Sequence, residues 1–312
     1  MAQRQLSASE LQALVRLLGD SDERTVKVAR TRLLEAGPEA VPWLHAAATS
    51  EPDAVVRGRA RLLLDEVRFR TLKRRLAELA RQDDATFDLE EGLFAVARAR
   101  YPDLEESSYR QRLRGLWEEL QQRRVGRMSP PEAAAAVNRY LFHELGFKSN
   151  EAHYYDPDNV CINQVLDRRT GVGVSLAALY LVVSRRAGFD VAAISVAGHV
   201  VVAVPGPVAF WVDPARSGRV LSRHDLAAFA SEGGHRLDEA ALAPLPDRKL
   251  VERMLAHLMR VYALTSQAVA AQRVEELMRT FTRGQTEEPP SRSSGASRAG
   301  GPGAPEEHGG SR

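Results

Sequence analysis

The chain has 312 residues, 44% of them hydrophobic, and its 43 basic residues nearly balance 41 acidic ones to leave a net charge of +2. This balance argues against generic nucleic-acid binding, which requires concentrated positive charge. No apolar run reaches the roughly 18 residues of a membrane-spanning helix, and the N-terminal MAQRQLSASE lacks the apolar segment of a signal peptide. Cys161 is the one cysteine, which excludes an intrachain disulfide and a cysteine-rich metal site. We therefore expect a cytoplasmic protein with no cofactor and no membrane association.

The first 81 residues are predicted to be helical. Ser7 and Glu10 have the spacing of a capping box before the apolar LQALVRLL. Further helices are expected at about residues 23–36, at 39–49, and from Pro52 towards residue 80, the last of them with a possible bend.

Two segments within this region echo each other. VKVARTRLL at 26–34 matches VVRGRARLL at 55–63, an offset of 29 residues. A period near 30 in paired helices predicts two stacked helical hairpins, which resemble short bacterial HEAT repeats. Two interpretations are open: a scaffold that binds a partner, or a helical cap that shields the apolar surface of the next domain.

Residues 82–150 are predicted to form a helical lead-in. One helix opens at Asp88 and ends at Tyr101, and a second runs over 107–124 with an apolar stripe at helical spacing. Ser129, followed by two prolines and a glutamate, is a strong start signal for a third helix, which Gly146 closes.

The amino-acid composition changes over residues 151–246, which contain more turn-forming and β-branched residues. A turn-rich stretch with a short helix at 160–167 precedes an apolar helix that Ser175 opens. Apolar and β-branched runs at 191–196, 199–204 and 208–212 are separated by glycine and proline turns, which is typical of strands. These features predict an α+β domain in which one helix packs on a small antiparallel sheet.

The end of the chain returns to helix at 221–230 and as a C-terminal helix over 247–281. Residues 282–312 consist of glycine, serine, proline and charged residues. Such a segment buries too little apolar area to offset chain entropy, so it is predicted to be disordered.

Three polar residues in this domain have the order of an acyl-transfer site. Ser175 lies at the start of a helix, where free N–H groups could form an oxyanion hole. His199 opens a strand, and Asp213 ends the strand after it, where it could orient the imidazole. A proline-glycine-proline hairpin between the two strands would set His199 and Asp213 side by side.

The surrounding motifs resemble the transglutaminase-like superfamily, in particular its SirB subgroup. The resemblance extends over about residues 85–262, and its residues are Asn150, Tyr154-Tyr155-Asp156-Pro157-Asp158-Asn159, NQVLDRRTG from Asn163, SLAALY from Ser175, Gly198-His199 and Asp213-Pro214. It implies a papain-like α+β core in which Ser175, His199 and Asp213 occupy the cysteine, histidine and aspartate positions of active transglutaminases. It also implies that serine is the usual residue at the nucleophile position of the subgroup.

Several roles remain open for these residues. Ser175 is interpreted as a helix N-cap, as a nucleophile with His199 as base, or as part of a polar recognition pocket with His199 and Asp213. The candidate binding residues, which line a pocket or fasten the loop to the core, are Tyr155, Asn159, Asn163, Arg169 and Gly198. Cys161 is expected to be a small buried hydrophobic residue, and no histidines have metal-ligand spacing.

The sequence favours a transglutaminase-fold protein that binds a protein or peptide partner without turnover. One alternative is a serine-dependent amide or ester hydrolase, or acyl transferase, that uses Ser175, His199 and Asp213. Another is a scaffold whose N-terminal repeats perform all the recognition.

Overall fold

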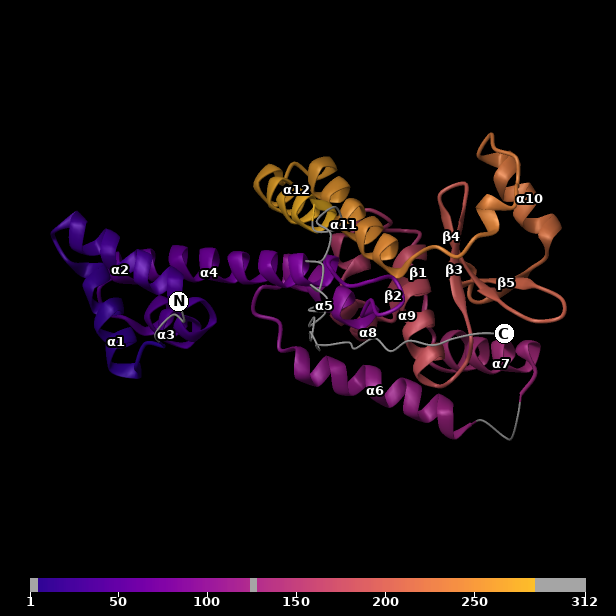
Figure 1. Ribbon diagram of the computed structural model, residues 1–312, viewed down its shortest axis with the longest axis horizontal. Coiled ribbons are helices and arrows are strands. Elements are labelled where there is room, and N and C mark those ends of the chain that lie inside the picture. Colours follow the sequence, from indigo (N-terminus) through magenta and orange to yellow (C-terminus); the bar gives the residue numbers. More distant parts are fainter. Residues whose placement is uncertain (1–4, 124–127, 284–312) are drawn as a thin grey trace, which may run out of the picture.

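The computed structural model describes residues 5–123 and 128–283. Its N-terminal end is a helical unit formed by α1 (Ala8–Arg16), α2 (Glu23–Ala36), α3 (Val41–Ser50) and the first half of α4 (Ala54–Ala80), with short 3₁₀ turns between them. This unit stands at one end of an elongated molecule, and α4 connects it to the rest (Figure 1). The four predicted helices are confirmed, and α4 is continuous.

Local signals account for where these helices begin. The Ser7 N–H donates to the Glu10 carboxylate at 2.7 Å, and the Glu10 N–H donates to Ser7 Oγ at 3.3 Å, which completes the predicted capping box. Asp53 accepts from the N–H of Val55 at 2.7 Å and so caps α4.

The two matching segments do not bury equivalent positions of their shared sequence. In α2, Val26 and Leu33 are buried, but the residues 29 positions later, Val55 and Leu62, are 54% and 75% exposed. Their successors Val56 and Leu63 are the buried ones. Because one residue turns a helix by about 100°, the two matching segments present different positions of their shared pattern to the interior.

Helix α4 belongs to two hydrophobic clusters. Residues from Val56 to Val67 pack with α1–α3, whereas Leu72, Leu76 and Leu79 pack into the main core. The division between the clusters lies within α4, between Val67 and Leu72, so it does not coincide with the predicted domain boundary at residue 81.

Three further helices lead into the core, namely α5 (Leu89–Arg100), α6 (Glu106–Gln122) and α7 (Pro130–Asn138). Asp88 caps α5, and α7 begins with the predicted serine-glutamate capping box and continues as a π-helix over Arg139–Glu144. Helix α6 begins one residue earlier than expected, because the N–H of Ser107 donates to Glu105, which is the N-cap.

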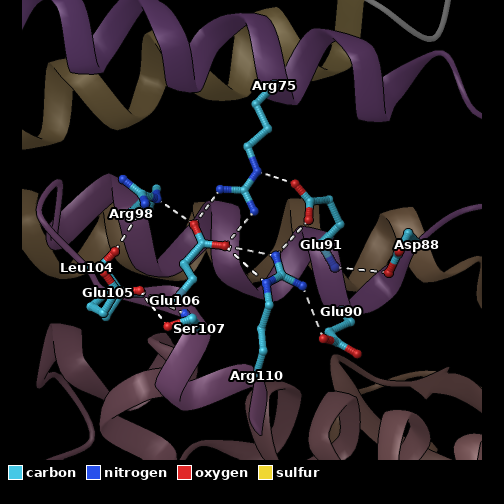
Figure 2. Close-up of polar contacts among 10 residues, drawn as sticks. All are labelled: Arg75, Asp88, Glu90, Glu91, Arg98, Leu104, Glu105, Glu106, Ser107 and Arg110. Atoms are coloured by element: carbon cyan, nitrogen blue, oxygen red, sulfur yellow. Dashed lines mark hydrogen bonds and ion pairs between the residues drawn. The ribbon is translucent and has the colours of Figure 1, made fainter. Parts of the chain in front are cut away.

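A network of ion pairs joins α4, α5 and α6, as Figure 2 shows. Glu106 of α6 accepts from Arg75 of α4 at 2.9 Å, from Arg98 of α5 at 2.5 Å and from Arg110 of α6 at 2.8 Å. Arg75 and Arg110 also bind Glu91. Burial disfavours the charge on Glu106, but the hydrogen bonds from the three arginines outweigh it and lower the pKa to about 2.

The predicted antiparallel sheet is present, with a fourth strand that the sequence reasoning missed. Its order is β3 (Ala192–Val196), β4 (His199–Val204), β5 (Phe210–Asp213) and β6 (Arg219–Leu221), each strand antiparallel to the next. A separate short parallel pair, β1 (Lys148–Ser149) and β2 (Thr170–Gly171), was not predicted either. Each of these three missed strands has only two or three residues, too few to show a period.

The two faces of the four-stranded sheet are covered by different helices. Val200, Val202 and Val204 belong to the main core with α9 (Gly173–Arg186). Val201 and Trp211 belong to a smaller cluster with α10 (Arg223–Glu232). Alternation along β4 therefore sends even-numbered side chains towards α9 and odd-numbered ones towards α10.

The turn-rich segment before α9 holds the 3₁₀ helix η4 (Pro157–Val160) and α8 (Ile162–Arg168). At the C-terminal end, the single helix predicted for 247–281 is instead a pair, α11 (Asp247–Leu264) and α12 (Ala268–Arg283). The break falls at Ser266, which has a left-handed φ of 59°, and α12 folds back so that its buried face packs in the main core.

Helix α12 extends through Arg283, so the predicted disorder from residue 282 is wrong for its first two residues, and the rest of that prediction lies outside the described residues. Within residues 5–123 and 128–283, no helix combines the length and apolarity that a membrane crossing demands.

Candidate functional site

Ser175 is not the N-cap of its helix. Helix α9 begins at Gly173 and Val172 is the N-cap, so Ser175 is the third helical residue. From there its Oγ reaches back and accepts a hydrogen bond from the N–H of Val172 at 3.0 Å. The N-cap interpretation of Ser175 is therefore wrong, although the hydroxyl does satisfy an N–H at the start of the helix.

The hydroxyl of Ser175 is enclosed by main chain. It donates to the carbonyl of Asn159 at 2.6 Å, with the carbonyl of Val172 at 3.0 Å as a second acceptor, and the residue is 2% exposed. A Cβ added at Gly171 would lie 2.6 Å from this Oγ. Ser175 thus joins the start of α9, the η4 segment and β2 at one closely packed point.

Asn159 extends this junction into the preceding loop. Its Nδ2 donates to the carbonyls of His153 at 2.8 Å and Tyr154 at 3.2 Å, and its Oδ1 accepts from Asn150 at 2.9 Å. The buried amide therefore holds the loop over the start of α9.

His199 follows a tight turn between β3 and β4. Ala197 and Gly198 form the two-residue turn with left-handed φ angles of 47° and 86°, and Val196 pairs with His199. A positive φ costs glycine little but is unusual for alanine. The exposed imidazole stacks on Phe229 of α10 with ring centroids 5.5 Å apart, so it lies on the α10 side of the sheet.

Asp213 lies at the buried end of β5. Its carboxylate accepts from the N–H of Ala215 at 2.9 Å and lies 3.8 Å from Arg216. Burial raises its pKa, while the Ala215 N–H and the charges of Arg216 and His199 oppose that shift. Arg216 in turn stacks on Phe229 at 4.6 Å.

The structure groups two of the three candidate catalytic residues. His199 and Asp213 lie on one side of the sheet with Arg216 and Phe229, although no hydrogen bond joins the imidazole to the carboxylate among the described residues. Ser175 belongs to α9, on the other side of the sheet, and in the described part of the chain its hydroxyl makes no hydrogen bond to His199.

The remaining candidate residues have separate positions. Tyr155 is 50% exposed and packs edge-on against Tyr154. Asn163 is buried in α8 with its Oδ1 unpartnered. Arg169 ends α8 with a left-handed φ of 55° and donates to the carbonyl of Leu145 at 2.8 Å. Gly198 occupies the turn before His199.

Cys161 is fully buried, and burial raises the pKa of its thiol, so the thiolate needed for nucleophilic attack is disfavoured. Among the described residues, no three histidine, cysteine or acidic side chains gather closely enough to hold a metal ion.

Sequence reasoning missed Arg216 and Phe229. Phe229 lies in a predicted helix, but its spacing from His199 carries no information on contact. Arg216 follows the Asp213-Pro214 motif by two residues, and this proximity was the available signal.

Comparisons with known proteins agree with this architecture. A family model described as the transglutaminase-like superfamily matches residues 107–256. A UPF0162 protein of Xylella fastidiosa strain Temecula1 is 38% identical over 194 residues, which cover 60% of this chain and 69% of that protein. The chain belongs with the UPF0162 proteins and contains a transglutaminase-like domain over residues 107–256.

Two other similar proteins match over different lengths of the chain. A UPF0162 protein of Vibrio cholerae is 27% identical over 213 residues, which cover 66% of this chain and 78% of that protein. F-box only protein 21 of Mus musculus is 39% identical over 64 residues, 20% of this chain and 10% of that protein. No solved structure gave a significant match.

Proposed function

We propose that this transglutaminase-like protein is of the SirB type and binds a protein or peptide partner without catalysing acyl transfer. The observation that carries the proposal is the state of Ser175, whose hydroxyl donates to the carbonyl of Asn159 at 2.6 Å and is almost fully enclosed. A serine nucleophile needs its proton directed at a base, and here the acceptor is a main-chain carbonyl.

The surface available to a partner lies beside this junction. Tyr154 and Tyr155 are 48% and 50% exposed at the loop that Asn159 holds in place. Aromatic side chains on a fixed loop provide large contact area at low entropic cost, which favours recognition.

The alternative is a serine-dependent hydrolase or acyl transferase with Ser175, His199 and Asp213. It is favoured by His199 and Asp213 lying on the same side of the sheet. It requires Ser175 to leave its main-chain partners and His199 to leave Phe229, two changes on opposite sides of β4.

A third possibility is that the N-terminal helices form a HEAT-like scaffold that performs the recognition. Their separate hydrophobic cluster and the exposed Leu62 on α4 favour it. The shift in burial register between the two echoing segments argues against a regular repeat.

Labelling with a fluorophosphonate probe tests the absence of catalysis. We expect equal, background labelling of the wild type and Ser175→Ala. Labelling that Ser175→Ala abolishes would establish the hydrolase instead.

A photo-crosslinking amino acid in place of Tyr155 or Leu62 identifies the surface that contacts the partner. We expect adducts from position 155 and not from position 62. Adducts from position 62 alone would favour the scaffold, and adducts from neither position would contradict both.

A further inference from the structure

Arg253 of α11 holds an unusual position at the β3–β4 turn. Its Nη2 donates to Ser195 Oγ at 2.7 Å, and its Nη1 lies 3.4 Å from the carbonyl of Gly198. Both partners are uncharged. The residue is partly buried, and burial lowers the pKa of its guanidinium.

Several partly buried arginines in the described part of the chain bind carboxylates, whereas Arg57, like Arg253, donates only to uncharged groups, the main-chain carbonyls of Glu51 and Pro52. Arg75 and Arg110 bind Glu106, and Arg100 binds Asp158. No carboxylate lies within ion-pair distance of Arg253 in residues 5–123 and 128–283. Partial removal of a cation from water without a counter-charge is unfavourable, so a carboxylate bound to Arg253 would be stabilised by the attraction between the two charges.

The surroundings of Arg253 suit an organic anion. A guanidinium has five N–H donors, and Arg253 uses two of them here, which leaves three for a ligand. One turn further along α11, His257 has a buried Nε2 without a partner and packs edge-on against Tyr154 at 5.3 Å. Position 253 is thus one helical turn from His257 on α11, and His257 contacts Tyr154, which packs against Tyr155.

We propose that Arg253 binds the carboxylate of an acidic side chain in a peptide that lies against the β3–β4 turn and the Tyr154-Tyr155 pair. This proposal rests on the proposed peptide-binding function and names the chemistry of its partner. The carboxylate supplies the missing counter-charge, and the planar guanidinium fixes its orientation through charge-assisted hydrogen bonds.

The test uses fluorescence anisotropy with two labelled ten-residue peptides, one alternating glutamate and alanine and the other alternating glutamine and alanine. The full-length wild type is expected to bind the glutamate peptide at least tenfold more tightly. Arg253→Gln removes the charge and keeps a polar amide donor at this position, and it is expected to weaken glutamate-peptide binding about 10- to 100-fold. Arg253→Lys should bind more tightly than Arg253→Gln but less tightly than the wild type, because lysine supplies the charge without the planar pair of N–H donors.

Arg260→Gln is the matched control, because Arg260 is an exposed arginine on the same helix. It should remain within about twofold of wild type if general electrostatic attraction is minor. Equal losses from both variants, equal affinity for the two peptides, or no binding at millimolar concentration would each overturn the carboxylate site. The non-catalytic proposal is judged separately by fluorophosphonate labelling, so the two failures are distinguishable.

Discussion

At the scale of single residues, the hydroxyl of Ser175 makes its hydrogen bonds with main-chain groups. It bonds the N–H of Val172 and the carbonyl of Asn159, both buried. Ser184 of the same helix is also fully buried, but its Oγ has no partner. Both serines of α9 are therefore buried, but the hydroxyl of Ser175 is hydrogen-bonded and that of Ser184 is not.

This difference predicts opposite responses to alanine. Ser175→Ala leaves a buried N–H and a buried carbonyl unpaired and is expected to lower the free energy of unfolding by about 1–3 kcal/mol. Ser184→Ala removes an unsatisfied hydroxyl and should be neutral or stabilising. Urea denaturation of both variants measures this, and equal effects would show that the hydrogen bonds of Ser175 contribute nothing specific.

At the scale of elements, the Glu106 network joins α4, α5 and α6 (Figure 2). The folded-state pKa of Glu106, about 2, lies below the value of about 4.3 for an unfolded chain. Because the folded pKa is depressed, the stabilisation is present above about pH 4.3 and is lost as the pH falls towards 2.

We therefore expect Glu106→Gln to lower the free energy of unfolding at pH 7 by about 2–3 kcal/mol. The gap to the wild type should shrink progressively between about pH 4.3 and pH 2. Glu118→Gln, an exposed change in the same helix, should show no such gap. Urea unfolding across this pH range measures the difference in free energy of unfolding between the wild type and Glu106→Gln. A difference that stays constant with pH would rule out the ionised Glu106 as its source.

At the scale of the whole molecule, α12 lies against α4 on its way back from the core (Figure 1). Arg273 of α12 donates to the Asp65 carboxylate of α4 through Nη1 at 2.9 Å and Nη2 at 2.6 Å. At the other end of α12, Phe281 is fully buried and packs edge-on against Phe87 with centroids 6.2 Å apart. The C-terminal helix thus supports the point where α4 passes from one hydrophobic cluster to the other.

Phe281→Ala is expected to destabilise the protein by about 3–5 kcal/mol, because it opens a cavity in the main core. Val269→Ala in the same helix is the control, since Val269 is 75% exposed, and it should change stability by less than about 0.5 kcal/mol. Thermal or urea unfolding measures both. A small effect at Phe281 would mean that α12 is not part of the cooperative core.

The sequence by itself determined the helices up to α10, the three longer strands and the chain order of Ser175, His199 and Asp213, because capping residues, periodicity and motifs are local signals; it did not determine the break between α11 and α12. It did not determine the start of α9, two residues before Ser175, since only the hydrogen bond from Val172 to the serine hydroxyl reveals it. The tertiary structure alone decided that His199 packs on Phe229 and that Arg253 reaches the β3–β4 turn without a carboxylate. Such contacts join segments 30 or more positions apart, and no local pattern encodes which side of a sheet each side chain meets.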